Sequence, residues 1–257
     1  MHLMTIEAPQ ARPAATVALV RDGPRGLQTW MMRRVPGMAF AAGACVFPGG
    51  RVDESDADVS IRWHGNTPEW FAERLGVEVT LARAVVTAAV RELFEESGVL
   101  LTVPPLTNDL EAARHAVESR TTGLSGWLAE QSCVLDVSGL RPWGRWVTPL
   151  TEPRRFDTWF FVAVVPTSVE ARSATTEAES AGWFDIQHLL DSAASRQLHV
   201  LPPTIVMLRG LLRAGSVSGV LEAAETRPMG PVYPQVQRNE DGTVLVRGGG
   251  EEVTVRP

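Results

Sequence analysis

The sequence predicts an α/β protein in which a β-hairpin and a buried strand lie against one long helix. Two runs of small, β-branched or apolar residues, 15–21 and 27–32, flank a turn rich in glycine and proline, which indicates a hairpin. The range 156–165 is almost continuously apolar, which is typical of a strand covered on both faces. Residues 80–97 contain neither glycine nor proline, and Gly98 follows where a left-handed C-terminal cap belongs. The sheet is therefore expected to be at least partly central.

Before the long helix, we expect a short strand, a loop and a short helix. The strand, 44–47, ends at Pro48, which lacks a donor for the ladder, and at two glycines that permit positive φ. Thr-Pro-Glu at 67–69 has the cap, the first-turn proline and the early acid of a helix start, and this helix should end near Gly76. The residues between the strand and the long helix thus form a loop that contains one helix.

After the long helix, the sequence predicts one more helix, an irregular segment and a series of short elements. The helix should begin at a cap at Thr107 and run toward Thr121, and the chain should then be irregular through Gly123 and Gly126. The later elements are strands at 145–148, 156–165 and 182–184, helices at 186–195 and from 202 onward, and tail strands at 243–247 and 252–256.

The composition is that of a globular protein, and it excludes some partners. Hydrophobic residues make up 44% of the chain and charged residues 21%, which is enough apolar material for a sizeable core. The formal net charge of -6 argues against a nucleic-acid binder, since phosphate backbones require a surplus of basic residues. We expect a single domain over residues 1–257, with an insertion at about 54–79 and a C-terminal extension at about 200–257.

The number of cysteines and the length of the apolar runs indicate in which cellular compartment the protein is expected. Cys45 and Cys133 are too few for a four-thiolate zinc site or a disulfide scaffold, which favours a reducing cytoplasm. No export signal is evident at the N-terminus, and no stretch approaches the roughly 18 apolar residues of a membrane span. We therefore expect a cytoplasmic protein without a membrane partner.

Three glutamates share one face of the long helix. Glu92, Glu95 and Glu96 stand at offsets of zero, three and four, which lie on one face of a helix at about 100° per residue. Their repulsion costs roughly a few tenths of a kcal/mol per pair, and a divalent cation would offset it. Carboxylate oxygens are the ligands that Mg²⁺ prefers, and this ion commonly bridges substrate phosphates. Such a cluster alone is more often a solvated helix face, so the surrounding residues must decide.

Those surrounding residues resemble the signature of the Nudix hydrolases, G-x5-E-x7-R-E-U-x-E-E-x-G-U, in which U is a bulky apolar residue. The segment 91–99, Arg-Glu-Leu-Phe-Glu-Glu-Ser-Gly-Val, matches the second half at every specified position, and Gly50 matches the opening glycine. Arg91 follows Gly50 by 41 positions instead of 14, so about 27 residues are inserted. The intervening acid is Asp56 when counted from Gly50, but the position counted back from Arg91 is Arg83, which leaves its identity open.

The resemblance implies a fold and a reaction. The fold would be a Nudix-type α/β/α sandwich with a mixed sheet, a helical insertion inside the signature and extra C-terminal helices. The reaction would be hydrolysis of a diphosphate in a small nucleotide, with Mg²⁺ or Mn²⁺ held by Glu92, Glu95, Glu96 and the carbonyl of Gly50. Arg91 would orient a glutamate by an ion pair, while the choice of general base stays open because relatives differ. Since relatives are often dimers, a homodimer is among the implied assemblies.

Further segments are similar to the branch of the family that contains peroxisomal coenzyme A diphosphatases. These segments are 33–40, 43–53, 154–158 and 201–204. The arginine that the coenzyme A signature has four residues before Gly43 is replaced by Ala39. The branch implies coenzyme A or acyl-coenzyme A as the substrate. ADP-ribose or NADH hydrolysis is one alternative, and a catalytically weak ligand sensor or interaction module with this fold is another.

Six more residues are candidates for substrate binding. The guanidinium groups of Arg33, Arg34, Arg154 and Arg155 could hold phosphate oxygens bidentately, although each could equally be an ordinary surface charge. Glu177 and Glu179 lie where many Nudix proteins carry an extra catalytic acid, and the alternative for both is a solvated loop.

Overall fold

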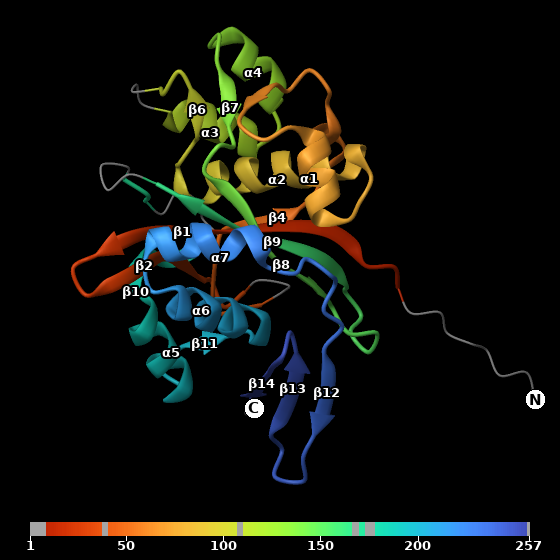
Figure 1. Cartoon of the computed structure of the whole chain (residues 1–257), viewed down its shortest axis with the longest axis vertical. Helices are drawn as coiled ribbons and strands as arrows, with labels where there is room; N and C mark the ends of the chain where they lie inside the picture. Colours follow the sequence, from red (N-terminus) through yellow and green to blue (C-terminus); the bar gives the residue numbers. More distant parts are fainter. Residues whose placement is uncertain (1–8, 38–40, 107–109, 166–169, 173–177, 256–257) are drawn as a thin grey trace, which may run out of the picture.

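A mixed β-sheet with helices on both faces forms the centre of the protein (Figure 1). The computed structural model describes residues 9–37, 41–106, 110–165, 170–172 and 178–255. Among these residues the main sheet has eight strands: β1 (Arg12–Gly23), β2 (Gly26–Arg34), β3 (Ala44–Val46), β4 (Gly49–Arg51), β8 (Leu140–Val147), β9 (Phe156–Val164), β10 (Ala178–Asp185) and β11 (His199–Val200). The order along the sheet is β11-β3-β2-β1-β9-β8, while β4 pairs with β1 and β10 with β2. Because β1 runs parallel to β9 and antiparallel to β2, the sheet is mixed as the resemblance implied.

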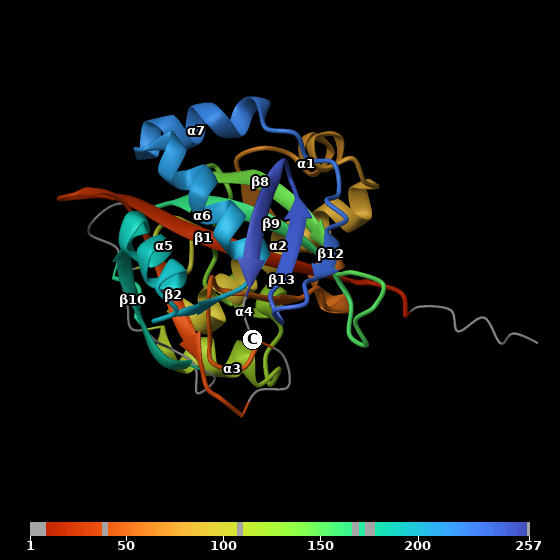
Figure 2. The ribbon, with the colours of Figure 1, turned by 90° about the horizontal axis from the view of Figure 1, so that it is seen from below.

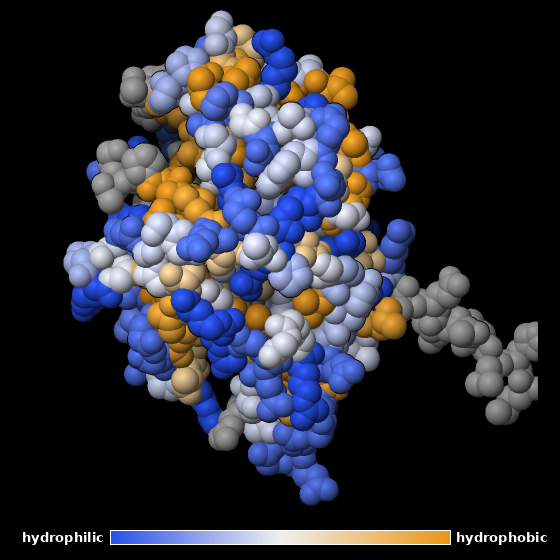
Figure 3. All heavy atoms as spheres, viewed as in Figure 1, coloured by the Kyte–Doolittle hydropathy of each residue, from blue (hydrophilic) through white to orange (hydrophobic). Residues whose placement is uncertain are grey.

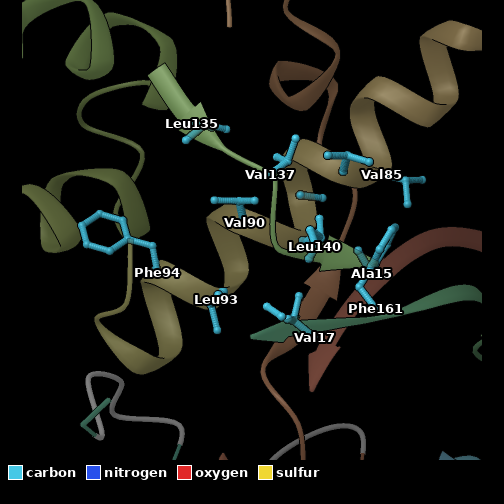
Figure 4. Close-up of a cluster of buried hydrophobic side chains, with 14 of the residues drawn as sticks. Ala15, Val17, Val85, Val90, Leu93, Phe94, Leu135, Val137, Leu140 and Phe161 are labelled. Atoms are coloured by element: carbon cyan, nitrogen blue, oxygen red, sulfur yellow. The ribbon is translucent and has the colours of Figure 1, made fainter. Parts of the chain in front are cut away.

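One face of the main sheet carries α1 (Pro68–Leu75), α2 (Val79–Ser97), α3 (Glu111–Glu118) and α4 (Leu124–Glu130). We call the cluster on this side the α2-side core. It joins Val90 and Leu93 of α2 to Val17 of β1 and Phe161 of β9, all of them buried (Figure 4). A small sheet of β5 (Trp63–His64), β7 (Val134–Asp136) and β6 (Thr102–Val103) lies on the same side. The long helix is thus fixed directly against the centre of the main sheet.

The opposite face carries α5 (Ile186–Ala194), α6 (Pro202–Ala214) and α7 (Val217–Thr226), whose buried residues form the α6-side core (Figure 2). Side chains alternate along a strand, so Val17 and Leu19 enter the α2-side core while Ala18 and Val20 enter the α6-side core. This double burial explains the continuous apolar runs in the sequence. The arrangement confirms the expected α/β/α sandwich.

The helix ends follow the sequence signals closely. Thr67 caps α1, with its side-chain oxygen accepting a hydrogen bond from the Trp70 amide at 3.3 Å. Gly76 ends α1 at φ 66°, and Gly98 ends α2 at φ 70°, both in the left-handed region that favours glycine. The predicted bounds of both helices are therefore confirmed.

Several short elements differ from the expectation or were not expected. The segment expected to be irregular contains α4, which includes Gly126 and buries Leu124, Trp127 and Leu128. Its apolar residues are too few to show a helical period, so tertiary packing decides its structure. α7 and the paired strands β5 to β7 also lacked a sequence signal. The predicted cap at Thr107 lies outside the described residues, and α3 is described from Glu111.

The tail forms a separate three-stranded sheet of β12 (Gln235–Arg238), β13 (Val244–Gly248) and β14 (Glu251–Val255). The second and third of these strands were predicted, although Arg256 lies outside the described residues. This sheet projects at the lower end of the view in Figure 1, where the surface is mostly hydrophilic (Figure 3).

Within the described part of the chain, no helix alone has the length and apolar character to cross a membrane. The pair α6 and α7 reaches that length and composition only when the two are counted together, across a bend of 113°.

Candidate active site

The candidate active site lies where the C-terminal half of α2 meets β4. β4 pairs with β1 through Gly50 and Ala15, which places its glycines beside the centre of the sheet. A Cβ atom on Gly49 would stand 2.5 Å from the Ala15 carbonyl oxygen, and one on Gly50 would stand 2.4 Å from Glu92 Oε1. Both positions therefore require glycine for close approach and not for a turn.

Arg91 is the most highly connected side chain of the site, although it is only 5% exposed. Its Nε and Nη2 donate to the two carboxylate oxygens of Asp56, each at 2.9 Å. Its Nη1 donates to Glu92 at 2.8 Å and to Glu95 at 3.2 Å, and Nη2 also donates to the Arg51 carbonyl at 2.9 Å. These contacts engage all five N–H groups of the guanidinium. The expected ion pair between Arg91 and a glutamate is present in this structure.

We assign Asp56 as the acid between Gly50 and Arg91 in the signature, whose identity the sequence left open. It is 2% exposed, and besides Arg91 it accepts a hydrogen bond from the Asp53 amide at 2.8 Å at the start of the 3₁₀ turn η1 (Glu54–Ala57). The position counted from Gly50 is therefore the one that meets Arg91, whereas Arg83 instead donates to the Ile61 carbonyl. The added residues lie after Asp56, in the part of the chain that contains β5 and α1.

The three glutamates are not a solvated helix face. Glu96 is 6% exposed, and the side chains of Glu92 and Glu95 are 13% and 14% exposed. Burial raises the pKa of Glu92 to about 7, although the adjacent Arg91 lowers it. Burial also raises the pKa of Glu95, again against the effect of Arg91. Buried carboxylates need a compensating partner, and Arg91 is the cation that the described residues supply.

The donor set has the chemistry of a divalent-cation site, although its side chains do not converge as ligands. In the described residues, no three His, Cys, Asp or Glu side chains form a metal-holding group. Glu92 and Glu95 point to Arg91, and Glu96 accepts a hydrogen bond from the Gly49 amide at 2.8 Å. Carboxylate and backbone carbonyl oxygens are nevertheless the hard donors that Mg²⁺ and Mn²⁺ take.

The other predicted site residues that the structure describes lie in two places. Arg33 of β2 and Glu179 of β10 form an ion pair at 3.6 Å on adjacent strands, and Arg34 pairs in register with Ala178. Arg154 and Arg155 precede β9 and line a cavity of about 770 Å³ that Arg51 also lines. Glu177 and Ala39 lie outside the described residues.

Two arginines that the sequence reading missed support the site from α3 and the loop after it. Arg114, 3% exposed, donates to the Glu95 carbonyl at 3.1 Å and pairs with Glu111 and Glu118. Arg120 pairs with Asp53, whose carboxylate lies 3.8 Å from Arg91. The one sequence signal for Arg114 is its spacing from two acids on the same helix, Glu111 three residues before it and Glu118 four residues after it.

Comparison with known proteins identifies one family. The model of the NUDT19 Nudix domain matches residues 67–211. The chain is 24% identical to the acyl-coenzyme A diphosphatase NUDT19 of Xenopus laevis over 95% of this chain and 76% of that protein. It is 26% identical to the Homo sapiens protein of the same name, over 96% of this chain and 78% of that one.

A solved structure gives the same result. The Nudix hydrolase from Alicyclobacillus acidocaldarius is 30% identical, with a TM-score of 0.73, over 86% of this chain and 99% of that one. The matched domain covers more than half of the chain and includes Arg91 and the three glutamates. The chain therefore belongs to the Nudix family and is a Nudix hydrolase.

Proposed function

We propose that the chain hydrolyses the diphosphate linkage of coenzyme A or an acyl-coenzyme A, with Mg²⁺ or Mn²⁺ as the cofactor. The observation that carries the reaction is the set of three little-exposed glutamates on α2. Arg91 donates hydrogen bonds to Glu92 and Glu95, the Gly49 amide donates to Glu96, and Gly50 lies against Glu92. The names of the two acyl-coenzyme A diphosphatases, together with the matching domain, support the substrate.

The residues of the site would have the following roles in the reaction. Glu92, Glu95, Glu96 and the Gly50 carbonyl would hold the cation, which supplies charge neutralisation for the diphosphate and a lower pKa for a bound water. Glu92 would serve either as one of these ligands or as the group that accepts the proton of the attacking water. Arg91 keeps Glu92 and Glu95 in place through Nη1. The water oxygen bonds to phosphorus as the phosphoanhydride bond breaks, which leaves two phosphomonoesters.

A substrate panel tests this proposal. We would measure kcat/KM for coenzyme A, an acyl-coenzyme A, ADP-ribose and NADH at fixed Mg²⁺, at fixed Mn²⁺ and with a chelator. We expect the coenzyme A compounds to rank first, two phosphomonoester products by mass spectrometry, and no turnover with the chelator. A coenzyme A rate below the ADP-ribose or NADH rate would refute the substrate but not the family. Tight binding of a panel member with no turnover in any arm would favour the sensor alternative.

A further inference from the structure

A basic cavity lies near the candidate active site, at the end of the main sheet where β1 and β9 begin. Its volume is about 770 Å³, and four arginines line it: Arg12, Arg51, Arg154 and Arg155. Its lining among the described residues includes no carboxylate side chain. We call this cavity the arginine pocket.

The backbone around the arginine pocket is held by hydrogen bonds. The Arg12 amide donates to the Arg155 carbonyl at 3.0 Å, at the point where β1 and β9 begin their parallel pairing. The Arg155 side chain donates from Nε to the Thr148 carbonyl at 3.1 Å and from Nη1 to the Pro9 carbonyl at 2.6 Å. Figures 1 and 2 both show the start of β1 beside the loop that precedes β9. The pocket is thus built by two segments that the fold ties together.

Arg51 joins the arginine pocket to the catalytic glutamates. It is one of the residues that line the pocket, and its carbonyl oxygen accepts a hydrogen bond from Arg91 at 2.9 Å. Its neighbour Gly50 contacts Glu92, and adjacent α-carbons are about 3.8 Å apart. The pocket and the glutamates are thus linked through neighbouring residues of β4. Phe156, which also lines it, adds an aromatic surface suited to a nucleoside.

We propose that the arginine pocket binds a phosphomonoester on the nucleoside part of the substrate, apart from the diphosphate that is cut. Guanidinium groups recognise phosphate through paired hydrogen bonds, and a cavity of this volume admits a nucleotide. The inference rests on the proposed function, because coenzyme A carries such a group on its ribose. Beyond the proposed function, the inference assigns three residues that distinguish coenzyme A from a substrate without that phosphate: Arg12, Arg51 and Arg154.

The test compares coenzyme A with 3′-dephospho-coenzyme A, which differ only in this phosphate. At about 50 mM ionic strength, where exposed charges are weakly screened, the parent should prefer coenzyme A in kcat/KM by about tenfold or more. Arg12→Gln and Arg154→Gln should each lower that ratio several-fold, and the double variant should lower it further. Arg247→Gln, which removes an exposed arginine of β13 paired with Glu252, is the matched control and should keep the parent ratio.

A binding experiment without metal separates this inference from the proposed function. By calorimetry, the parent should bind adenosine 3′,5′-bisphosphate more tightly than AMP, and the two variants should lose that difference. If the parent cleaves neither coenzyme A compound, the proposed function fails while the calorimetry still decides the role of the arginine pocket. Equal affinity for the two nucleotides, or a parent kcat/KM ratio near one, would overturn the inference.

Discussion

Gly50 shows how one missing side chain can set the position of another. Its α-carbon approaches Glu92 so closely that any Cβ atom would collide with the carboxylate. A catalytic group that is displaced by about 1 Å can lose roughly a hundredfold in rate. The requirement for glycine at this position therefore comes from the site and not from the backbone angles of β4.

We expect Gly50→Ala to lower kcat by about a hundredfold, because the new methyl group must displace the Glu92 carboxylate. Gly230→Ala is the control, since a Cβ atom there meets nothing within 4 Å. Steady-state kinetics on the best substrate and far-UV circular dichroism would be measured for both variants. A folded Gly50→Ala protein with the parent kcat would show that Glu92 does not need this position.

Arg91 offers a second test at the scale of one residue. Lysine keeps the charge but cannot reach Asp56 bidentately and both Glu92 and Glu95 at once. We expect Arg91→Lys to lower the free energy of unfolding by about 2 kcal/mol, because buried acceptors lose their donors. Urea denaturation measures this loss.

The control for Arg91 is Arg247→Lys, at an exposed ion pair on β13, which should change stability by no more than about 0.5 kcal/mol. Equal effects of the two substitutions would mean that the contacts of Arg91 contribute nothing specific.

At the scale of elements, α1 belongs to the α2-side core even though it lies among the residues inserted into the signature. Phe71 is fully buried there, and its ring meets Trp63 and Trp70 edge to face. An insertion that only shaped the substrate cleft would not need such packing. α1 thus supports the helix that carries the glutamates.

We expect Phe71→Ala to destabilise the protein by about 3 to 5 kcal/mol, as for other buried aromatic residues. Val59→Ala, in the same insertion but 80% exposed, should stay within about 0.5 kcal/mol of the parent. Thermal and urea unfolding of both variants would show whether the insertion is part of the core. A Phe71→Ala protein as stable as Val59→Ala would show that it is not.

The elements also show what sequence reasoning could reach. α1 and α2 were predicted to within a residue or two because caps, proline and glycine mark their ends locally. α4 was not predicted because the residues against which it packs lie elsewhere in the chain. Asp56 stayed ambiguous because a count along the chain cannot tell on which side of it the added residues fall, whereas the contact with Arg91 can.

For the whole molecule, the cofactor should appear in stability as well as in activity. A ligand that binds only the folded state at about 100 times its Kd adds about 2.7 kcal/mol. We expect Mg²⁺ to raise the Tm of the parent. Glu95→Gln and Glu96→Gln should reduce this shift and remove most turnover at limiting Mg²⁺.

Glu73→Gln, on the exposed side of α1, is the control for the Mg²⁺ experiment and should keep both the Tm shift and the turnover. Differential scanning fluorimetry with Mg²⁺ or chelator measures the shift. Parent-like shifts and rates in Glu95→Gln and Glu96→Gln would rule out these two carboxylates as ligands.

The pairing of Asp56 with Arg91 has a consequence for how such a chain can change in evolution. The two residues stand 35 positions apart, yet their ion pair closes the intervening chain at its base. Closing a longer loop costs only about 0.6 kcal/mol more for each doubling of its length. Residues can therefore be gained or exchanged between Asp56 and Arg91 without moving the glutamates, provided that the new residues keep the buried packing that Phe71 contributes to the core.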